Sequence, residues 1–146
     1  MDDPGLLDSN YDTWVISGSR RWDDATSLYA RLDNAVVQFG APTLIIQGGC
    51  PTGVDHLSAM WAADRRIEHR AMPAEWDAYK LAAGPIRNRA MLGTYPDALV
   101  VALPTETSVG TVDMIGEAKR RGRAVAVAAT DGSWGFRPGV TQQALW

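Results

Sequence analysis

The chain has 146 residues, of which 46% are hydrophobic and 21% are charged, and its net charge is −3. This length suits a single domain with a core of its own. The negative charge argues against a surface built for long nucleic acid, which usually needs a basic face. The single cysteine, the lack of an apolar run of membrane-spanning length and the acidic start at Met1–Pro4 predict a soluble, cytoplasmic protein without membrane contact.

Short apolar runs alternate with amphipathic segments along most of the chain. After a loose lead-in over residues 1–11, the predicted elements in chain order are a strand at 13–17, a helix at 24–39, a strand at 43–47, a helix at 52–66, a strand at 67–72, a short helix at 75–83, a helix at 84–92, a strand at 97–103, a helix at 110–121 and a strand at 124–128. Asp23 or Asp24 is expected to cap the first helix. The inward face of the helix at 52–66 is expected to comprise Val54, Leu57, Met60 and Trp61.

Strands that are continuously apolar are typical of a parallel sheet covered by helices on both faces. We therefore predict a Rossmann-like, three-layer α/β/α domain over residues 12–129, with a parallel five-stranded sheet in the order 3-2-1-4-5. The tail over residues 130–146 ends in Ala144-Leu145-Trp146 and is expected to dock on this domain.

In an open parallel sheet, ligands bind beyond the carboxyl ends of the strands, where the strand order reverses. Three loops rich in Gly, Ser and Thr are predicted at this edge, and two of them lead directly into a helix. Helix starts and flexible glycines favour a phosphate, and arginines add charge. The predicted ligand-binding residues are Gly18, Ser19, Arg20, Gly48, Gly49, Thr52, Gly53, Asp55, Arg87, Asn88, Gly110 and Thr111.

Several of these residues have a structural alternative. Glycines after strands also make simple turns. Thr52 and Asp55 have the spacing of a helix-capping box, whereas Asp55 could instead accept hydrogen bonds from a ribose. Arg87 opposes the dipole of a helix start, which indicates either an anion contact or an exposed arginine without a partner.

Other chemistries find little support in the sequence. No grouping of His, Cys and acidic residues has metal-ligand spacing, so we expect no metal site and no cofactor. Cys50 has no histidine near it in sequence and is interpreted as incidental. Trp22, Trp76 and Trp134 adjoin Gly, Pro or Asp, or lie close to them, and are candidates to line a surface cleft. Exposed tryptophans would also suit a homodimer face, and the oligomeric state stays open.

The chain resembles the SLOG superfamily, the Rossmann-like group of bacterial and phage proteins that includes DprA and the LOG enzymes, and above all its small YspA-like group. The motifs that carry the resemblance span about residues 13–128 and are Gly18-Ser19-Arg20-Arg21-Trp22, Gln47-Gly48-Gly49-Cys50-Pro51-Thr52-Gly53-Val54-Asp55, Pro73-Ala74-Glu75-Trp76, Ala83-Gly84-Pro85-Ile86-Arg87-Asn88-Arg89-Ala90-Met91 and Gly110-Thr111. The resemblance implies a nucleotide-binding fold whose pocket is formed by these loops.

The resemblance also bears on catalysis. LOG enzymes split nucleoside monophosphates with an arginine and with the glutamate of a P-G-G-x-G-T-x-x-E motif. Arg87 is the candidate for that arginine, but the chain reads Glu106-Thr107-Ser108-Val109-Gly110-Thr111-Val112-Asp113-Met114, so Met114 stands at the place of the glutamate. A methionine can neither take a proton nor stabilise a cation by charge.

Three functions follow as hypotheses. The favoured one is a binding module that senses, carries or sequesters a nucleotide or a nucleotide-derived phosphate, with no catalytic residue assigned. The first alternative is a nucleotide N-glycosidase that uses Asp55, Asp113 or Glu117. The second is a DprA-like nucleic-acid-binding protein, which the net charge disfavours.

Overall fold

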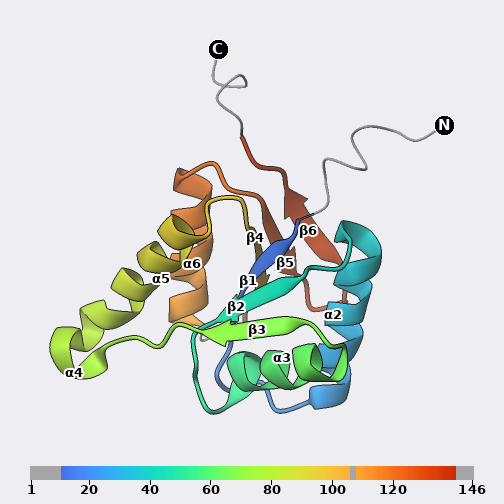
Figure 1. The fold of residues 1–146 in the computed structure, drawn as a ribbon, viewed down its shortest axis with the longest axis horizontal. Helices are drawn as coiled ribbons and strands as arrows, with labels where there is room; N and C mark the ends of the chain where they lie inside the picture. Colours follow the sequence, from blue (N-terminus) through green and yellow to red (C-terminus); the bar gives the residue numbers. More distant parts are fainter. Residues whose placement is uncertain (1–10, 106–107, 141–146) are drawn as a thin grey trace.

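A computed structural model describes residues 11–105 and 108–140 (Figure 1). The predicted lead-in, apart from Tyr11, lies outside the described residues. So do Glu106 and Thr107 of the motif compared with the LOG enzymes, and the terminal Ala144-Leu145-Trp146.

The described residues form one mixed sheet in the order β3-β2-β1-β4-β5-β6. In chain order the strands are β1 (Thr13–Gly18), β2 (Leu44–Gln47), β3 (Glu68–Ala71), β4 (Leu99–Leu103), β5 (Val125–Ala128) and β6 (Trp134–Arg137). The first five are parallel, and β1 pairs with β4 from Trp14 opposite Leu99 to Gly18 opposite Leu103. The Rossmann-like fold and the order 3-2-1-4-5 are confirmed. The predicted number of strands is too low by one, because β6 adds antiparallel to β5.

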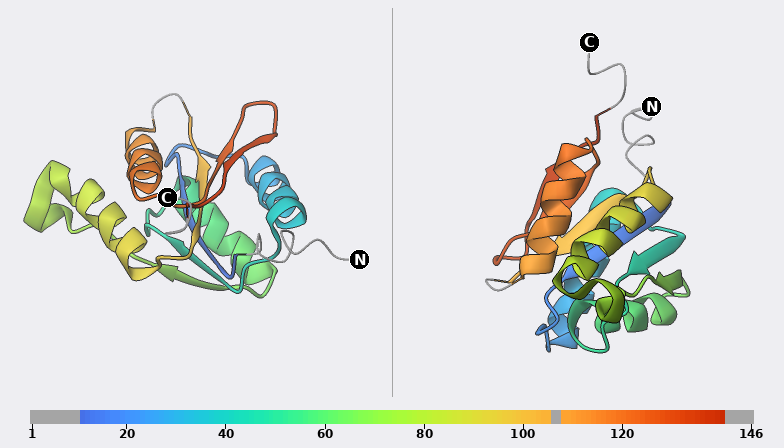
Figure 2. Two further views of the ribbon diagram at one scale, coloured as in Figure 1. Left: turned by 90° about the horizontal axis from the view of Figure 1, so that it is seen from above. Right: turned by 90° about the vertical axis from the view of Figure 1, so that its left-hand side faces the viewer.

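Helices cover both faces of the sheet, as Figure 2 shows from above. They are α2 (Ala25–Phe39), α3 (Gly53–Asp64), α4 (Trp76–Tyr79), the 3₁₀ helix η1 (Lys80–Ala82), α5 (Ala83–Thr94) and α6 (Val109–Arg120). One buried cluster joins the sheet to α2 and α3, and a second cluster joins its other face to α5 and α6. The three-layer arrangement follows, since each sheet face and each helix stripe must be buried against a partner.

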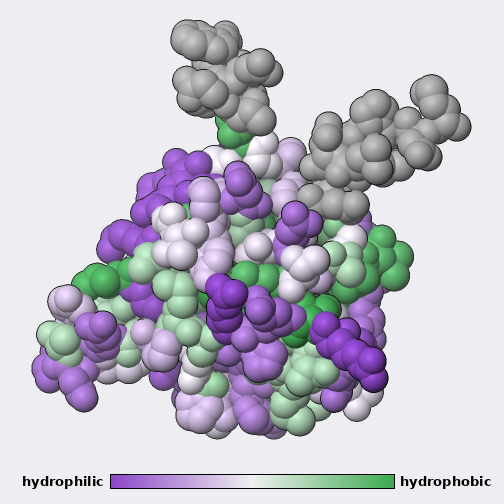
Figure 3. All heavy atoms as spheres, in the orientation of Figure 1, coloured by the Kyte–Doolittle hydropathy of each residue, from purple (hydrophilic) through white to green (hydrophobic). Residues whose placement is uncertain are grey.

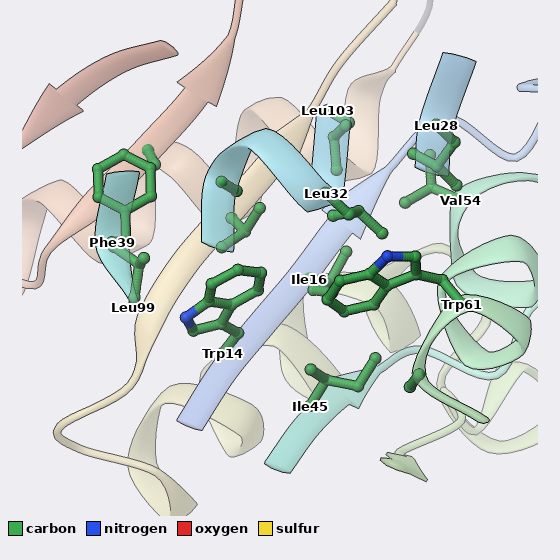
Figure 4. Packing of buried hydrophobic residues seen from close by; sticks show 14 of the residues in the cluster. Trp14, Ile16, Leu28, Leu32, Phe39, Ile45, Val54, Trp61, Leu99 and Leu103 are labelled. Carbon is green, nitrogen blue, oxygen red and sulfur yellow. The ribbon is translucent and has the colours of Figure 1, made fainter. Parts of the chain in front are cut away.

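Two aromatic rings organise the core beneath α2 and α3 (Figure 4). Trp14 of β1 stacks on Trp61 of α3 with ring centroids 6.1 Å apart. The Trp61 indole N–H donates to Asp33 of α2 over 2.9 Å, which ties α3 to α2. Met60 was expected to point inward but is 46% exposed, and Ser58 is buried instead. The buried stripe of α3 is rotated because the helix packs against α2 as well as the sheet.

Local capping fixes where α2 begins. The Asp24 carboxylate accepts a hydrogen bond from the backbone N–H of Ser27 over 3.1 Å, as an N-cap residue does, so the predicted cap is confirmed at Asp24. Two of the three tryptophans proposed for a surface cleft, Trp22 and Trp134, pack partly buried against the core on the α2 side.

The segment from α4 to η1 extends beyond the end of α5, away from the sheet, in both Figure 1 and Figure 2. Neither α4 nor η1 buries a residue. On the face that carries α5, Figure 3 shows hydrophilic side chains with hydrophobic ones scattered among them. No helix in the part of the chain that the structure describes is long and apolar enough to cross a bilayer.

Candidate functional site

A pocket of about 560 Å³ lies at the carboxyl ends of the parallel strands. Its walls come from the carboxyl end of β1, from the loops after β1, β2 and β3, and from residues of α3, α5 and α6. Its volume falls in the range of small-molecule sites, and its position beside β1 and β4 is where strand order reverses. The lining residues are Ile16, Ser17, Gly18, Ser19, Arg20, Arg21, Gly48, Gly49, Cys50, Pro51, Asp55, Pro73, Ala74, Trp76, Arg87, Asn88, Met91, Ser108, Val109, Gly110, Thr111 and Met114.

Most of the residues expected to bind a ligand line this pocket. They are Gly18, Ser19, Arg20, Gly48, Gly49, Asp55, Arg87, Asn88, Gly110 and Thr111. Thr52 and Gly53 do not line it. The structure therefore brings the three predicted loops together but assigns these two residues another role.

Thr52 and Gly53 clamp the loop after β1 against the start of α3. The Thr52 hydroxyl donates to the carbonyl of Arg20 over 2.9 Å. The Val54 N–H at the helix start donates to the carbonyl of Ser19, also over 2.9 Å. The structure thus engages the start of α3 with a backbone carbonyl and leaves Thr52 and Gly53 outside the pocket where a ligand was expected to meet them.

The capping box is wrong, since the Thr52 side chain makes no cap hydrogen bond to α3. The Asp55 carboxylate instead turns to the pocket, where it accepts the N–H of Cys50 over 3.1 Å. Burial raises the pKa of Asp55, although the N–H groups of Cys50 and Gly48 and the charges of Arg87 and Arg20 oppose this shift. Folding therefore shifts this carboxyl toward its protonated form relative to the unfolded chain.

This raised pKa predicts a pH-dependent stability effect. The folded protein binds the Asp55 proton more tightly than the unfolded chain, so this contribution is full at low pH and is lost as pH rises through the folded-state pKa. We expect Asp55→Asn, which imitates the protonated form, to be more stable than the wild type at pH 7, with the difference shrinking toward pH 3.5. Urea unfolding at both pH values measures it, and a stability gain that is equal at the two values would contradict it.

Arg87 lies across the loop after β2. Its Nη1 donates to the carbonyls of Gly48 over 3.0 Å and Met72 over 3.2 Å, and its Nε donates to Asn88 over 3.1 Å. A Cβ on Gly48 would overlap this guanidinium and lie 2.8 Å from Oδ2 of Asp55. Glycine at position 48 therefore makes room for Arg87, which is half-buried rather than the exposed arginine of the structural alternative.

The charge of Arg87 is poorly compensated. No carboxylate oxygen of the described residues lies within 4.0 Å of its nitrogens. Desolvation lowers the pKa of Arg87, the more distant charge of Asp55 raises it, and the charge of Arg20 lowers it further. Two arginines thus bring positive charge to one pocket that an anion would balance.

Asn88 connects Arg87 to the start of α6. Its amide oxygen accepts from Arg87, and its nitrogen donates to the carbonyl of Gly110 over 3.2 Å and to Asp113 over 2.9 Å. Within residues 11–105 and 108–140, nothing accepts a hydrogen bond from the N–H groups of Val109 and Gly110. These two N–H groups at a helix start are suited to an anion beside Arg87.

The carboxylates considered for catalysis differ in position. Glu117 is paired with Arg120 and Arg121, whose hydrogen bonds hold its pKa below the usual range. Asp113 is engaged by Asn88, and neither carboxylate lines the pocket. Met114 is fully buried and forms part of the pocket wall. Among the described lining residues, Asp55 is the only carboxylate.

Sequence reasoning did not assign several lining residues to the site. From the sequence, Trp76 is predicted only as a candidate to line a surface cleft, and Ser17 and Ser108 are not among the predicted binding residues. Ser17 lies at the end of β1, where its hydroxyl donates to Thr111 over 3.4 Å. Its place at the carboxyl end of the central strand was a signal that could have identified it.

Comparisons with known proteins place the chain in a family. The family model described as "YspA, cpYpsA-related SLOG family" matches residues 15–79, from β1 to α4. The Gene 61 protein of Mycobacterium phage D29 is 30% identical over 116 residues, which cover 74% of this chain and 89% of the phage protein. This match extends the similarity well beyond the part covered by the family model. The chain belongs to the YspA, cpYpsA-related SLOG family.

Proposed function

We propose that the pocket binds a nucleotide or a nucleotide-derived phosphate. The observation that carries this proposal is the half-buried guanidinium of Arg87, which faces a pocket at the strand-order reversal without a carboxylate in ion-pair range among the described residues. Membership of the SLOG family supports a nucleotide-related ligand.

The phosphate belongs at the end of the pocket formed by Arg87 and the start of α6. There the N–H groups of Val109 and Gly110 supply donors and the helix dipole adds partial positive charge. The planar guanidinium of Arg87 is held in place by Gly48, Met72 and Asn88, so little freedom is lost when it meets an anion.

Binding without turnover is the favoured function because the wall residue Met114 offers no proton chemistry. Asp55 could serve an N-glycosidase as its acid or base, since it is the one carboxylate among the described lining residues and burial raises its pKa. For that reason the test of binding also monitors bond cleavage.

We expect a nucleotide to raise the melting temperature of the protein. A ligand present at 100 times its dissociation constant stabilises the folded state by about 2.7 kcal/mol. A thermal-shift panel of the four ribonucleoside monophosphates, NAD and ribose 5-phosphate measures this effect, and each incubation is analysed for free base. A panel without any shift would contradict the proposal. Base release by the wild type that is lost in Asp55→Asn would replace binding with hydrolysis.

A further inference from the structure

Trp76 is the one large aromatic side chain among the described lining residues. It opens α4, directly after the loop that follows β3. It is 46% exposed and belongs to neither buried cluster. Core packing therefore does not account for this indole, which presents apolar area to water at the pocket wall.

The indole is nevertheless held in position. Its Cη2 atom lies 3.4 Å from the place where a Cβ would stand on Gly84, a buried glycine in the first turn of α5. The ring therefore rests close against the first turn of α5. A flat, supported and partly exposed ring is the usual platform for stacking a nucleic-acid base.

Arg20 faces the same ring from the loop after β1. The guanidinium carbon of Arg20 lies 5.9 Å from the centroid of Trp76. A planar group inserted between the two would need about 7 Å, that is, two contacts of about 3.5 Å. Arg20 is exposed, and its guanidinium makes no hydrogen bond within the described part of the chain. Its side chain can therefore move away from Trp76 by the difference between the observed and the required separation.

We infer that Trp76 is the base platform of this pocket and that Arg20 covers the base from the other side. This inference rests on the proposed function and narrows its ligand class. The pocket selects a phosphate ester that carries a planar aromatic base over a sugar phosphate, because a sugar phosphate leaves the Trp76 end empty. Arg87 and the start of α6 hold the phosphate, while Trp76 and Arg20 recognise the base.

Dissociation constants of the best nucleotide of the panel and of ribose 5-phosphate, measured by calorimetry, test the inference. We expect Trp76→Ala to weaken nucleotide binding about 5- to 150-fold and to leave ribose 5-phosphate unchanged, with a smaller loss for Trp76→Phe. Tyr79→Ala is the matched control, since Tyr79 lies on the same short helix, is 48% exposed and does not line the pocket. It should change neither constant.

The outcomes separate the two proposals. Equal losses for both ligands in Trp76→Ala, or no loss for either, would overturn the platform while leaving phosphate binding in place. Wild-type protein that binds ribose 5-phosphate as tightly as the nucleotide would also overturn the platform and leave phosphate binding in place. Wild-type protein that binds neither ligand would overturn the proposed function, and the platform with it. Melting curves of the variants show whether each one is folded.

Discussion

Replacing Gly53 with alanine is expected to lower the free energy of unfolding by about 3–5 kcal/mol. Gly53 has φ of +72°, where a side chain is strained, and its Cβ would overlap the Ser19 carbonyl oxygen and the Arg20 backbone, with the Arg20 carbonyl carbon at 2.5 Å. Backbone atoms cannot rotate away as a flexible side chain can. The clamp between the loop after β1 and α3 would therefore open. Urea denaturation of the variant and of the wild type measures this loss.

Gly110→Ala is the matched control for this prediction. Gly110 also lies at a helix start, but nothing described lies within 4 Å of its added Cβ. We expect its effect on stability to stay within about 0.5 kcal/mol, as at an ordinary surface site. If Gly53→Ala were as mild as Gly110→Ala, the clamp would not be structural. Both glycines were expected from sequence to serve the ligand, and of the two only Gly110 lines the pocket.

Replacing Arg87 with methionine is expected to weaken nucleotide binding about 100-fold, or roughly 3 kcal/mol. Methionine keeps much of the apolar stem but removes the half-buried charge and its planar fork. Arg87→Lys should recover only part of the affinity, because an ammonium group cannot reproduce the three hydrogen bonds to Gly48, Met72 and Asn88. Calorimetric titration with the nucleotide that gives the largest thermal shift measures these changes.

Arg89→Met controls for the loss of one positive charge from α5. Arg89 lies two residues further along the same helix, has a side chain that is 52% exposed, and sits 3.9 Å from Glu117 outside the pocket. We expect its affinity for the nucleotide to be close to that of the wild type. An equal loss in both variants would mean that Arg87 acts only through overall charge and not as a ligand of the phosphate.

Much of the fold can be read from the sequence because its strands are short and continuously apolar. Each of the five predicted strands exists, and the order follows from right-handed connections between parallel strands. Strand β6 could not be predicted in this way, since Trp134-Gly135-Phe136-Arg137 contains a glycine and follows a turn-rich stretch. Its hydrogen bonds come from the neighbouring edge of β5, which no local pattern encodes.

The pocket is only partly predictable for a similar reason. Glycine-rich loops after parallel strands mark the edge, so the sequence identifies which loops meet. It does not identify which helix start remains open to a ligand. Thr52 and Asp55 have the spacing of a capping box, yet the carbonyl of Ser19, more than thirty positions earlier in the chain, occupies that helix start. Whether the Thr52 side chain or the Ser19 carbonyl meets the start of α3 depends on how the two loops pack, which the local sequence does not encode.

The two walls of the pocket differ in how closely they are tied to the core. One wall is the loop after β1, clamped by Thr52, Gly53 and Val54. The opposite wall includes α4, which together with η1 buries no residue. Residues of the α4 wall can therefore be replaced without opening the core. The side chain at position 76 can therefore vary with the ligand while the fold is kept, and exposed neighbours outside the pocket, such as Tyr79, can vary without consequence for the ligand.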